Sequence, residues 1–221
     1  MTSTDPLFME WRDSLVQIHD EQLRDLLANR HIFHQFRDSV NRHAGDLRVP
    51  ELAEWMHQGY LAFACATVRK MAQQPKQGFN SVSLGILLDD LKNHHARLTR
   101  ANFVQLYDQN SPARRFADRD FDGVVGTPGC SSVPVAIIDK DIQDLKDITR
   151  PVKHLTDQVI VHTDLSRSKV TIPTYGQLDR AIDFLRDIFA RYHLLLTART
   201  YAPVPLDDHD VSRALARLWH G

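Results

Sequence analysis

A regular spacing of apolar residues, three or four positions apart, constrains the fold of this chain more than any other feature. Steps of three or four residues place side chains on one face of an α-helix. We therefore expect a single long helix near the middle of the chain, with Pro151 accommodated as a kink and His162 on the side that faces the core. The stripe consists of Ile138, Ile142, Leu145, Ile148, Val152, Leu155, Val159 and His162.

The same period recurs along most of the chain, so the sequence predicts an all-α protein built as a helical bundle. We expect N-terminal helices over residues 6–43, with Asp5 as the N-cap, Pro6 in the first turn and a kink near Asn29. Ser81 and Thr99 are the expected caps of two later helices. The remaining helices are expected at 50–74, 82–98, 99–107, 174–198 and, as a short C-terminal helix, 208–219.

Residues 108–136 interrupt this pattern with several Pro and Gly clusters, which predict a long irregular loop. Within it, "DRDFDG" at 118–123 matches the first half of a calcium-binding EF-hand loop. Gly129, however, occupies the twelfth position, where the motif needs a bidentate acid. We therefore expect a solvated acidic turn here. No Gly/Ser linker divides the 221 residues, which favours a single helical domain over 1–221.

Composition narrows the class of function. The 27 Lys and Arg residues against 28 Asp and Glu give a net charge of −1, which argues against a protein that grips duplex DNA through its phosphates. No P-loop, GxGxxG, GxSxG, HExxH or Cys-x-x-Cys motif is present, so we expect no cofactor and no metal. Cys65 is expected in the core and Cys130 in a loop. With no signal peptide or membrane span in the sequence, a reduced cytoplasm is the expected location.

Four segments, taken in order, resemble a known superfamily. They are "WMHQGYLAFACATVRKM", "SVSLGILLDDLKNH", a helix that starts at Asp139 after an intervening loop, and "DQVIVHTD". The last is similar to a helix end of the form Arg-Asp-Lys-x-Ile-Ala-His-x-Asp. This order resembles the HEPN superfamily, especially the abortive-infection HEPN domains of the AbiU kind, with an HEPN-like core at about 50–198.

The resemblance implies a compact bundle that forms a homodimer. It also implies a candidate catalytic group of His162, Asp164 and Asp157, because many members are metal-independent ribonucleases with an Arg-x4-6-His motif. Histidine can exchange a proton near neutral pH, and arginine can hold a phosphate. The sequence departs from the motif at the arginine, since the positions allowed for it are Leu155, Thr156 and Asp157. Basic residues expected to substitute as phosphate contacts are Arg69, Lys70 and Arg167.

Three functions therefore remain open. The first is a metal-independent ribonuclease in phage defence or a toxin–antitoxin pair, with His162 as acid or base. The second, favoured by the missing arginine and the inward-facing His162, is a non-catalytic HEPN-like module. It would bind RNA or a cognate partner protein, with no contact with a membrane. The third is an unrelated helical enzyme whose site lies in 108–136, where Asp118, Asp120 and Asp122 would converge.

Overall fold

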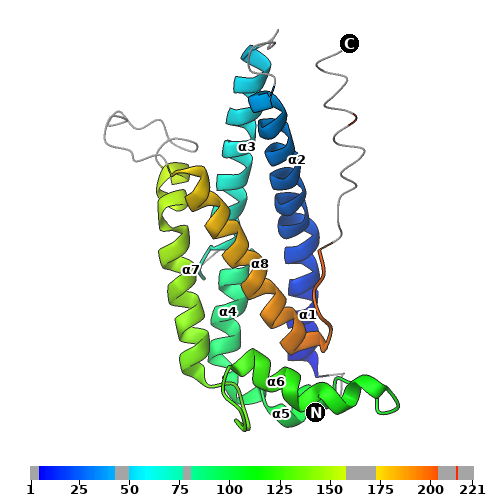
Figure 1. Ribbon diagram of the computed structural model, residues 1–221. Helices are drawn as coiled ribbons and strands as arrows, with labels where there is room; N and C mark the ends of the chain where they lie inside the picture. The colour runs from blue at the N-terminus through cyan, green and yellow to red at the C-terminus, as the bar shows by residue number, and fades with distance from the viewer. Residues whose placement is uncertain (1–4, 43–49, 77–80, 158–172, 204–212, 214–221) are drawn as a thin grey trace.

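The protein is all-α (Figure 1). The computed structural model describes residues 5–42, 50–76, 81–157, 173–203 and 213. Eight α-helices pack together within these ranges, and no strand occurs among them. The helices are α1 (Pro6–Ile18), α2 (Arg24–Arg42), α3 (Pro50–Met71), α4 (Leu84–Asn93), α5 (Arg100–Val104), α6 (Ala117–Val125), α7 (Val135–Leu155) and α8 (Tyr175–Thr197). Shorter elements are a π-helix at His19–Leu23 and 3-10 turns at His95–Arg97 and Pro112–Phe116.

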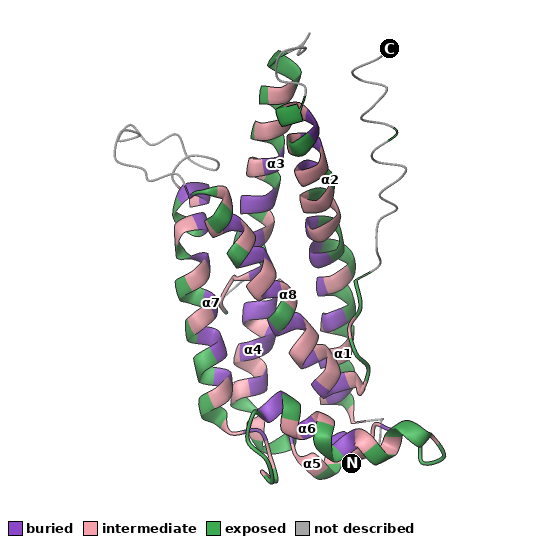
Figure 2. Cartoon of the chain, viewed as in Figure 1, coloured by how far each residue is buried: buried purple, intermediate pink, exposed green. Residues whose placement is uncertain are grey.

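The long helices run side by side, and α7 is a central member because it packs against α3, α4 and α8. In Figure 1, α5 and α6 lie across one end of the bundle. Each long helix has a buried face and an exposed face, as Figure 2 shows, which is the arrangement expected of amphipathic helices around a shared core. No helix within the described ranges is long and apolar enough to cross a membrane.

The apolar stripe of α7 is confirmed as a core face. Pro151 lies inside the helix, which continues to Leu155, as expected. One polar side chain, Asp141, is also buried in this face, where it accepts hydrogen bonds from Arg191 and Tyr192 of α8. The stripe residues buried in the structure are Ile138, Ile142, Leu145, Val152 and Leu155. The last two members of the stripe, Val159 and His162, lie outside the described residues.

The helix starts follow side-chain capping, with one correction. Asp5 and Thr99 cap α1 and α5 as expected. The cap of α4 is Ser83, and the prediction of Ser81 is wrong. Ser83 accepts a hydrogen bond from the Ile86 N–H and donates one to the Gln73 carbonyl, so it is held at both sides. The expected C-terminal helix at 208–219 falls on residues that the structure does not describe, apart from the helical Arg213.

The break in the N-terminal helical region lies ten residues earlier than expected. A π-helix at His19–Leu23 separates α1 from α2, and α2 continues without interruption through Asn29. The extra residue per turn of a π-helix changes which side chains face the core, and such turns are frequent at functional sites. His19, at the start of this turn, is directed toward the end of α8.

The expectation of an irregular loop throughout 108–136 is wrong. Residues 112–125 are helical, and α6 ends at Gly126, which has a φ of 70°. The helix forms because one face of it meets the core, through Ala117, Phe121, Val124 and Val125.

The acidic residues of this segment therefore belong to a helix, and not to the solvated turn that we expected. Asp118 and Asp122 both pair with Arg100, and Asp120 accepts a hydrogen bond of 2.8 Å from the Tyr107 hydroxyl. The hydrogen bond from Arg100 lowers the pKa of Asp122. The three carboxylates thus face partners of the chain itself, Asp118 and Asp122 on Arg100 and Asp120 on Tyr107, and do not meet as one acidic group.

Candidate functional site

The end of α7 brings together two of the residues expected at a site. Arg69 of α3 donates its Nε proton to Oδ1 of Asp157, two residues beyond the last residue of α7. The Arg69 and Asp157 side chains are 43% and 36% exposed, so the ion pair is accessible to solvent. The other expected members, His162, Asp164 and Arg167, lie outside the described residues.

Lys70, the second expected phosphate contact on α3, also faces a carboxylate. Its Nζ lies 3.6 Å from Glu21 Oε2 on the π-helix. Both side chains are about half exposed, so this pair is a weak surface contact. The two basic residues in the last turn of α3 are therefore each opposed by an acid.

The three positions where the resemblance places an arginine differ in their environment. Leu155 and Thr156 are buried in the core, and the Thr156 hydroxyl donates to the Val152 carbonyl. Asp157 is the member of the three that reaches solvent. Asp157 therefore has a positively charged group beside it, and this group is the guanidinium of Arg69 from α3.

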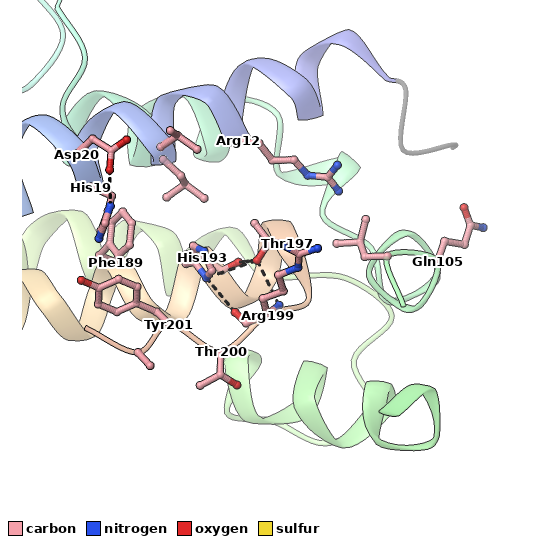
Figure 3. Close-up of a pocket in the computed structure, with 14 residues that line it drawn as sticks. Arg12, His19, Asp20, Gln105, Phe189, His193, Thr197, Arg199, Thr200 and Tyr201 are labelled. Atoms are coloured by element: carbon pink, nitrogen blue, oxygen red, sulfur yellow. Dashed lines mark hydrogen bonds and ion pairs between the residues drawn. The ribbon is translucent and has the colours of Figure 1, made fainter. Parts of the chain in front are cut away.

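A second site, which the sequence did not predict, lies at the C-terminal end of α8. A cavity of about 760 Å³ opens between α1, the C-terminal end of α8 and the segment 198–202 (Figure 3). Its volume is within the range of about 300–1,000 Å³ that is usual for small-molecule sites. A neighbouring cavity of about 860 Å³ between α2 and α8 shares His19 and Tyr201 with it.

The backbone shapes the cavity at both sides. On one side, the π-helix that begins at His19 directs this residue toward α8. On the other, α8 ends at Ala198, whose φ of 55° is a left-handed conformation that costs a non-glycine residue about 1 kcal/mol. This turn folds the following chain back, so that the ring of Tyr201 packs on the ring of Phe189 with centroids 5.0 Å apart.

Four rings line one end of the cavity: His19, Phe189, His193 and Tyr201. Tyr201 meets the other three edge to face, with centroids at 5.0–5.9 Å. Phe189 is buried and forms the floor, whereas the other three rings are half-buried. Figure 3 shows His19, Phe189 and Tyr201 grouped together on the side of the cavity away from Arg12.

Hydrogen bonds determine which nitrogen of each histidine carries a proton. His193 Nδ1 lies 2.9 Å from the Arg199 carbonyl, which can only accept, so Nδ1 donates. Burial lowers the pKa of His193, which keeps the ring neutral at pH 7 with Nε2 as an acceptor. In the same way, His19 Nδ1 lies 2.8 Å from Asp20 Oδ1 and donates to it.

Two arginines provide positive charge to the same cavity. Arg12 of α1 donates from Nε to the Leu196 carbonyl at 2.8 Å, which holds its guanidinium beside the end of α8. Arg199 is exposed and follows the left-handed turn at Ala198. Asp20 is the one acid among the residues that line the cavity. The cavity therefore combines an aromatic end with a cationic end.

No group of three or more His, Cys, Asp or Glu residues in the described part of the chain is arranged to hold a metal ion. His34, for example, pairs with one acid, Asp179, at 3.0 Å. No protein-family model, curated protein or solved structure matches the chain.

Proposed function

We propose that the protein is a non-catalytic HEPN-like binding module, in which the end of α7 is a degenerate form of a ribonuclease site. The observation that carries this proposal is the ion pair between Arg69 and Asp157. A phosphate binds to arginine because the guanidinium is positively charged and forks two of its oxygens. In this protein the Nε of Arg69 already donates to the carboxylate of Asp157, which offsets the positive charge that a phosphate would need.

Charge supports the same conclusion. Binding an RNA phosphate between Arg69 and Asp157 would either break the ion pair or place the phosphate beside a carboxylate. Lys70 is close to Glu21 in a similar way. The net charge of −1 over the whole chain adds no overall positive charge to offset these acids.

The partner that we propose is a protein, bound through one face of α3. Leu52, Trp55 and Phe63 recur at helical spacing and are 38%, 71% and 38% exposed. Gly59 lies between them on the same face, and its surroundings are open. Exposed apolar faces of this kind mark protein interaction sites. A second copy of the chain is the partner that the HEPN resemblance implies.

A metal-independent ribonuclease is the second candidate, and one observation favours it. Asp157 is separated from His162 by four residues, which is a spacing that the motif allows for its arginine. Arg69 reaches this position from α3, so the cation of the motif has a replacement. In this alternative, RNA displaces Asp157 from Arg69, and His162 transfers the proton.

Cleavage of RNA with metal ions chelated distinguishes the two candidates. For a binding module, the wild type and His162→Ala release the same background amount of product. His162→Ala then lowers the free energy of unfolding, because this candidate function assigns His162 to the core. For a ribonuclease, cleavage by the wild type is lost in both His162→Ala and Arg69→Gln, while the variants remain as stable as the wild type.

A further inference from the structure

We infer that the aromatic end of the cavity between α1, α8 and residues 198–202 binds a planar aromatic ring that carries an N–H or O–H donor and needs no charged group. Indoles, phenols and nucleobases are ligands of this chemical class. The inference concerns a site remote from the end of α7 and does not rest on the proposed function.

Two uncommon backbone conformations build this end of the cavity. The π-helix brings His19 to it from α1, and the left-handed Ala198, with a φ of 55°, turns the chain so that Tyr201 returns over α8. Conformations of this kind cost free energy and are frequent at functional sites. Their occurrence on both sides of one cavity favours a ligand site over an incidental gap between helices.

The rings of this end leave aromatic surface uncovered. Phe189 is buried, whereas His19, His193 and Tyr201 are half-buried and keep part of each ring accessible (Figure 3). Aromatic rings attract one another edge to face or offset-stacked, which is how these four rings already meet. A planar aromatic ligand can therefore add one more ring to the cluster.

Aliphatic side chains extend the apolar lining of the cavity. Leu15 is buried, Leu106 is half-buried, and Val16 is 60% exposed although its side chain is apolar. A ring that covers such a side chain removes apolar surface from water, which favours binding. The cavity volume of about 760 Å³ leaves room for a bicyclic ring.

One acceptor in the aromatic end selects a ring with a donor. His193 donates from Nδ1 to the Arg199 carbonyl at 2.9 Å, so Nε2 of the neutral ring is an acceptor. Burial lowers the pKa of His193, which favours this neutral form. Among the residues that the structure describes, none donates a hydrogen bond to Nε2. An N–H or O–H on the ligand satisfies this nitrogen, whereas a ring without a donor covers it and leaves it unpaired.

Titration of the full chain with indole and with benzofuran, followed by amide NMR spectra, tests the inference. Indole should bind with a Kd below about 1 mM, and its shifts should be confined to α1, the end of α8 and residues 198–202. Benzofuran has the same shape but an oxygen in place of the N–H. It should bind about twofold to tenfold more weakly, as expected for the loss of one neutral hydrogen bond.

Two substitutions separate the ring contacts from the hydrogen bond. Tyr201→Ala should weaken binding of indole by about tenfold, and Tyr201→Phe, which keeps the ring, should stay within about twofold of the wild type. His193→Phe keeps a ring but removes the Nε2 acceptor, so it should bind indole and benzofuran equally. Phe116→Ala is the control, because it removes a half-buried ring that does not line the cavity, and it should leave both affinities unchanged.

The inference is overturned if indole does not bind at about 1 mM, or if Tyr201→Ala binds it as tightly as the wild type does. It is equally overturned if the wild type binds benzofuran as tightly as indole, or if the preference for indole persists in His193→Phe. None of these outcomes depends on cleavage of RNA or on the end of α7.

Discussion

Arg69 on α3 and Asp157 beyond the end of α7 form an ion pair between two positions that are 88 residues apart in the sequence. The pair links α3 to the residues that follow α7 and places a carboxylate against the guanidinium of Arg69. Because both side chains are more than a third exposed, the pair contributes at most about 1 kcal/mol to stability. The pair therefore affects what can bind at the end of α7 more than it affects stability.

Asp141 should matter far more for stability. Its side chain is 6% exposed, and it accepts hydrogen bonds from Arg191 and from the buried hydroxyl of Tyr192. Asp141→Ala leaves that hydroxyl without its acceptor and should lower the free energy of unfolding by about 2–4 kcal/mol, measured by urea denaturation. Asp144→Ala removes an exposed ion pair from the same helix, with Lys140, and should cost less than about 1 kcal/mol. Equal losses in the two variants would contradict the assignment of Asp141 to a buried network.

Two glycines should respond in opposite directions to alanine. A Cβ at Gly85 would lie 2.4 Å from the Gln73 carbonyl oxygen, so Gly85→Ala must displace backbone and should destabilise by about 1–3 kcal/mol. A Cβ at Gly123, inside α6, meets nothing within 4 Å. Gly123→Ala should therefore stabilise by up to about 1 kcal/mol, because alanine loses less conformational entropy in a helix. Thermal unfolding of both variants checks the prediction, which fails if Gly85→Ala melts at or above the wild type.

The stability of the protein should depend on pH through His193. Burial lowers the pKa of His193 in the folded state below its ordinary value of 6.5. The unfolded state then binds more protons between these two values, so stability falls as the pH drops through 6.5. His193→Gln removes this contribution, because glutamine does not titrate.

The free energy of unfolding of the wild type and of His193→Gln, measured from about pH 8 to about pH 5.5, gives the test. The stability of His193→Gln relative to the wild type should increase as the pH falls. A difference that is constant with pH would show that His193 is not the group responsible.

The exposed face of α3 should mediate self-association. Trp55 and Phe63 are on this face, and their replacement by serine should convert a dimer to a monomer in sedimentation or light-scattering measurements. Met9→Ser, which removes an apolar side chain of α1 that is 50% exposed, should remain dimeric. A wild type that is monomeric at concentrations of about 0.1 mM would rule out a second copy as the partner.

The sequence predicts the elements of this fold better than it predicts its sites. The stripe on α7 and the caps Asp5 and Thr99 depend on local spacing, and the structure agrees with them. The helix α6 was missed because its nine residues are flanked by Pro and Gly clusters, and its apolar face becomes visible only against the core. Local pattern therefore predicts the long helices and the short α5 that follows a clear cap, but it does not predict α6.

The sites depend on contacts that the sequence does not contain. The residues Arg69 and Asp157 were both expected near a site, but their pairing follows from how α3 packs on α7. The ring cluster requires the packing of α1 on α8 and the turn at Ala198, where a left-handed alanine gives no signal in the sequence. His19 and His193 therefore looked like ordinary helix residues.

The affinity for a single-stranded RNA oligonucleotide, measured as a function of salt, tests the central claim that Asp157 neutralises Arg69. Asp157→Asn should bind RNA more tightly than the wild type, and its logarithmic salt slope should be steeper by about 0.7, the value for one additional phosphate contact. Arg69→Gln combined with Asp157→Asn should return to the wild-type affinity. Asp147→Asn is the control, because it removes the partner of Arg150 on α7 and changes the net charge by the same amount. It should increase the affinity for RNA less than Asp157→Asn does. If instead the wild type already binds as tightly as Asp157→Asn, and Arg69→Gln alone abolishes that binding, Arg69 is available to phosphate and the claim is wrong.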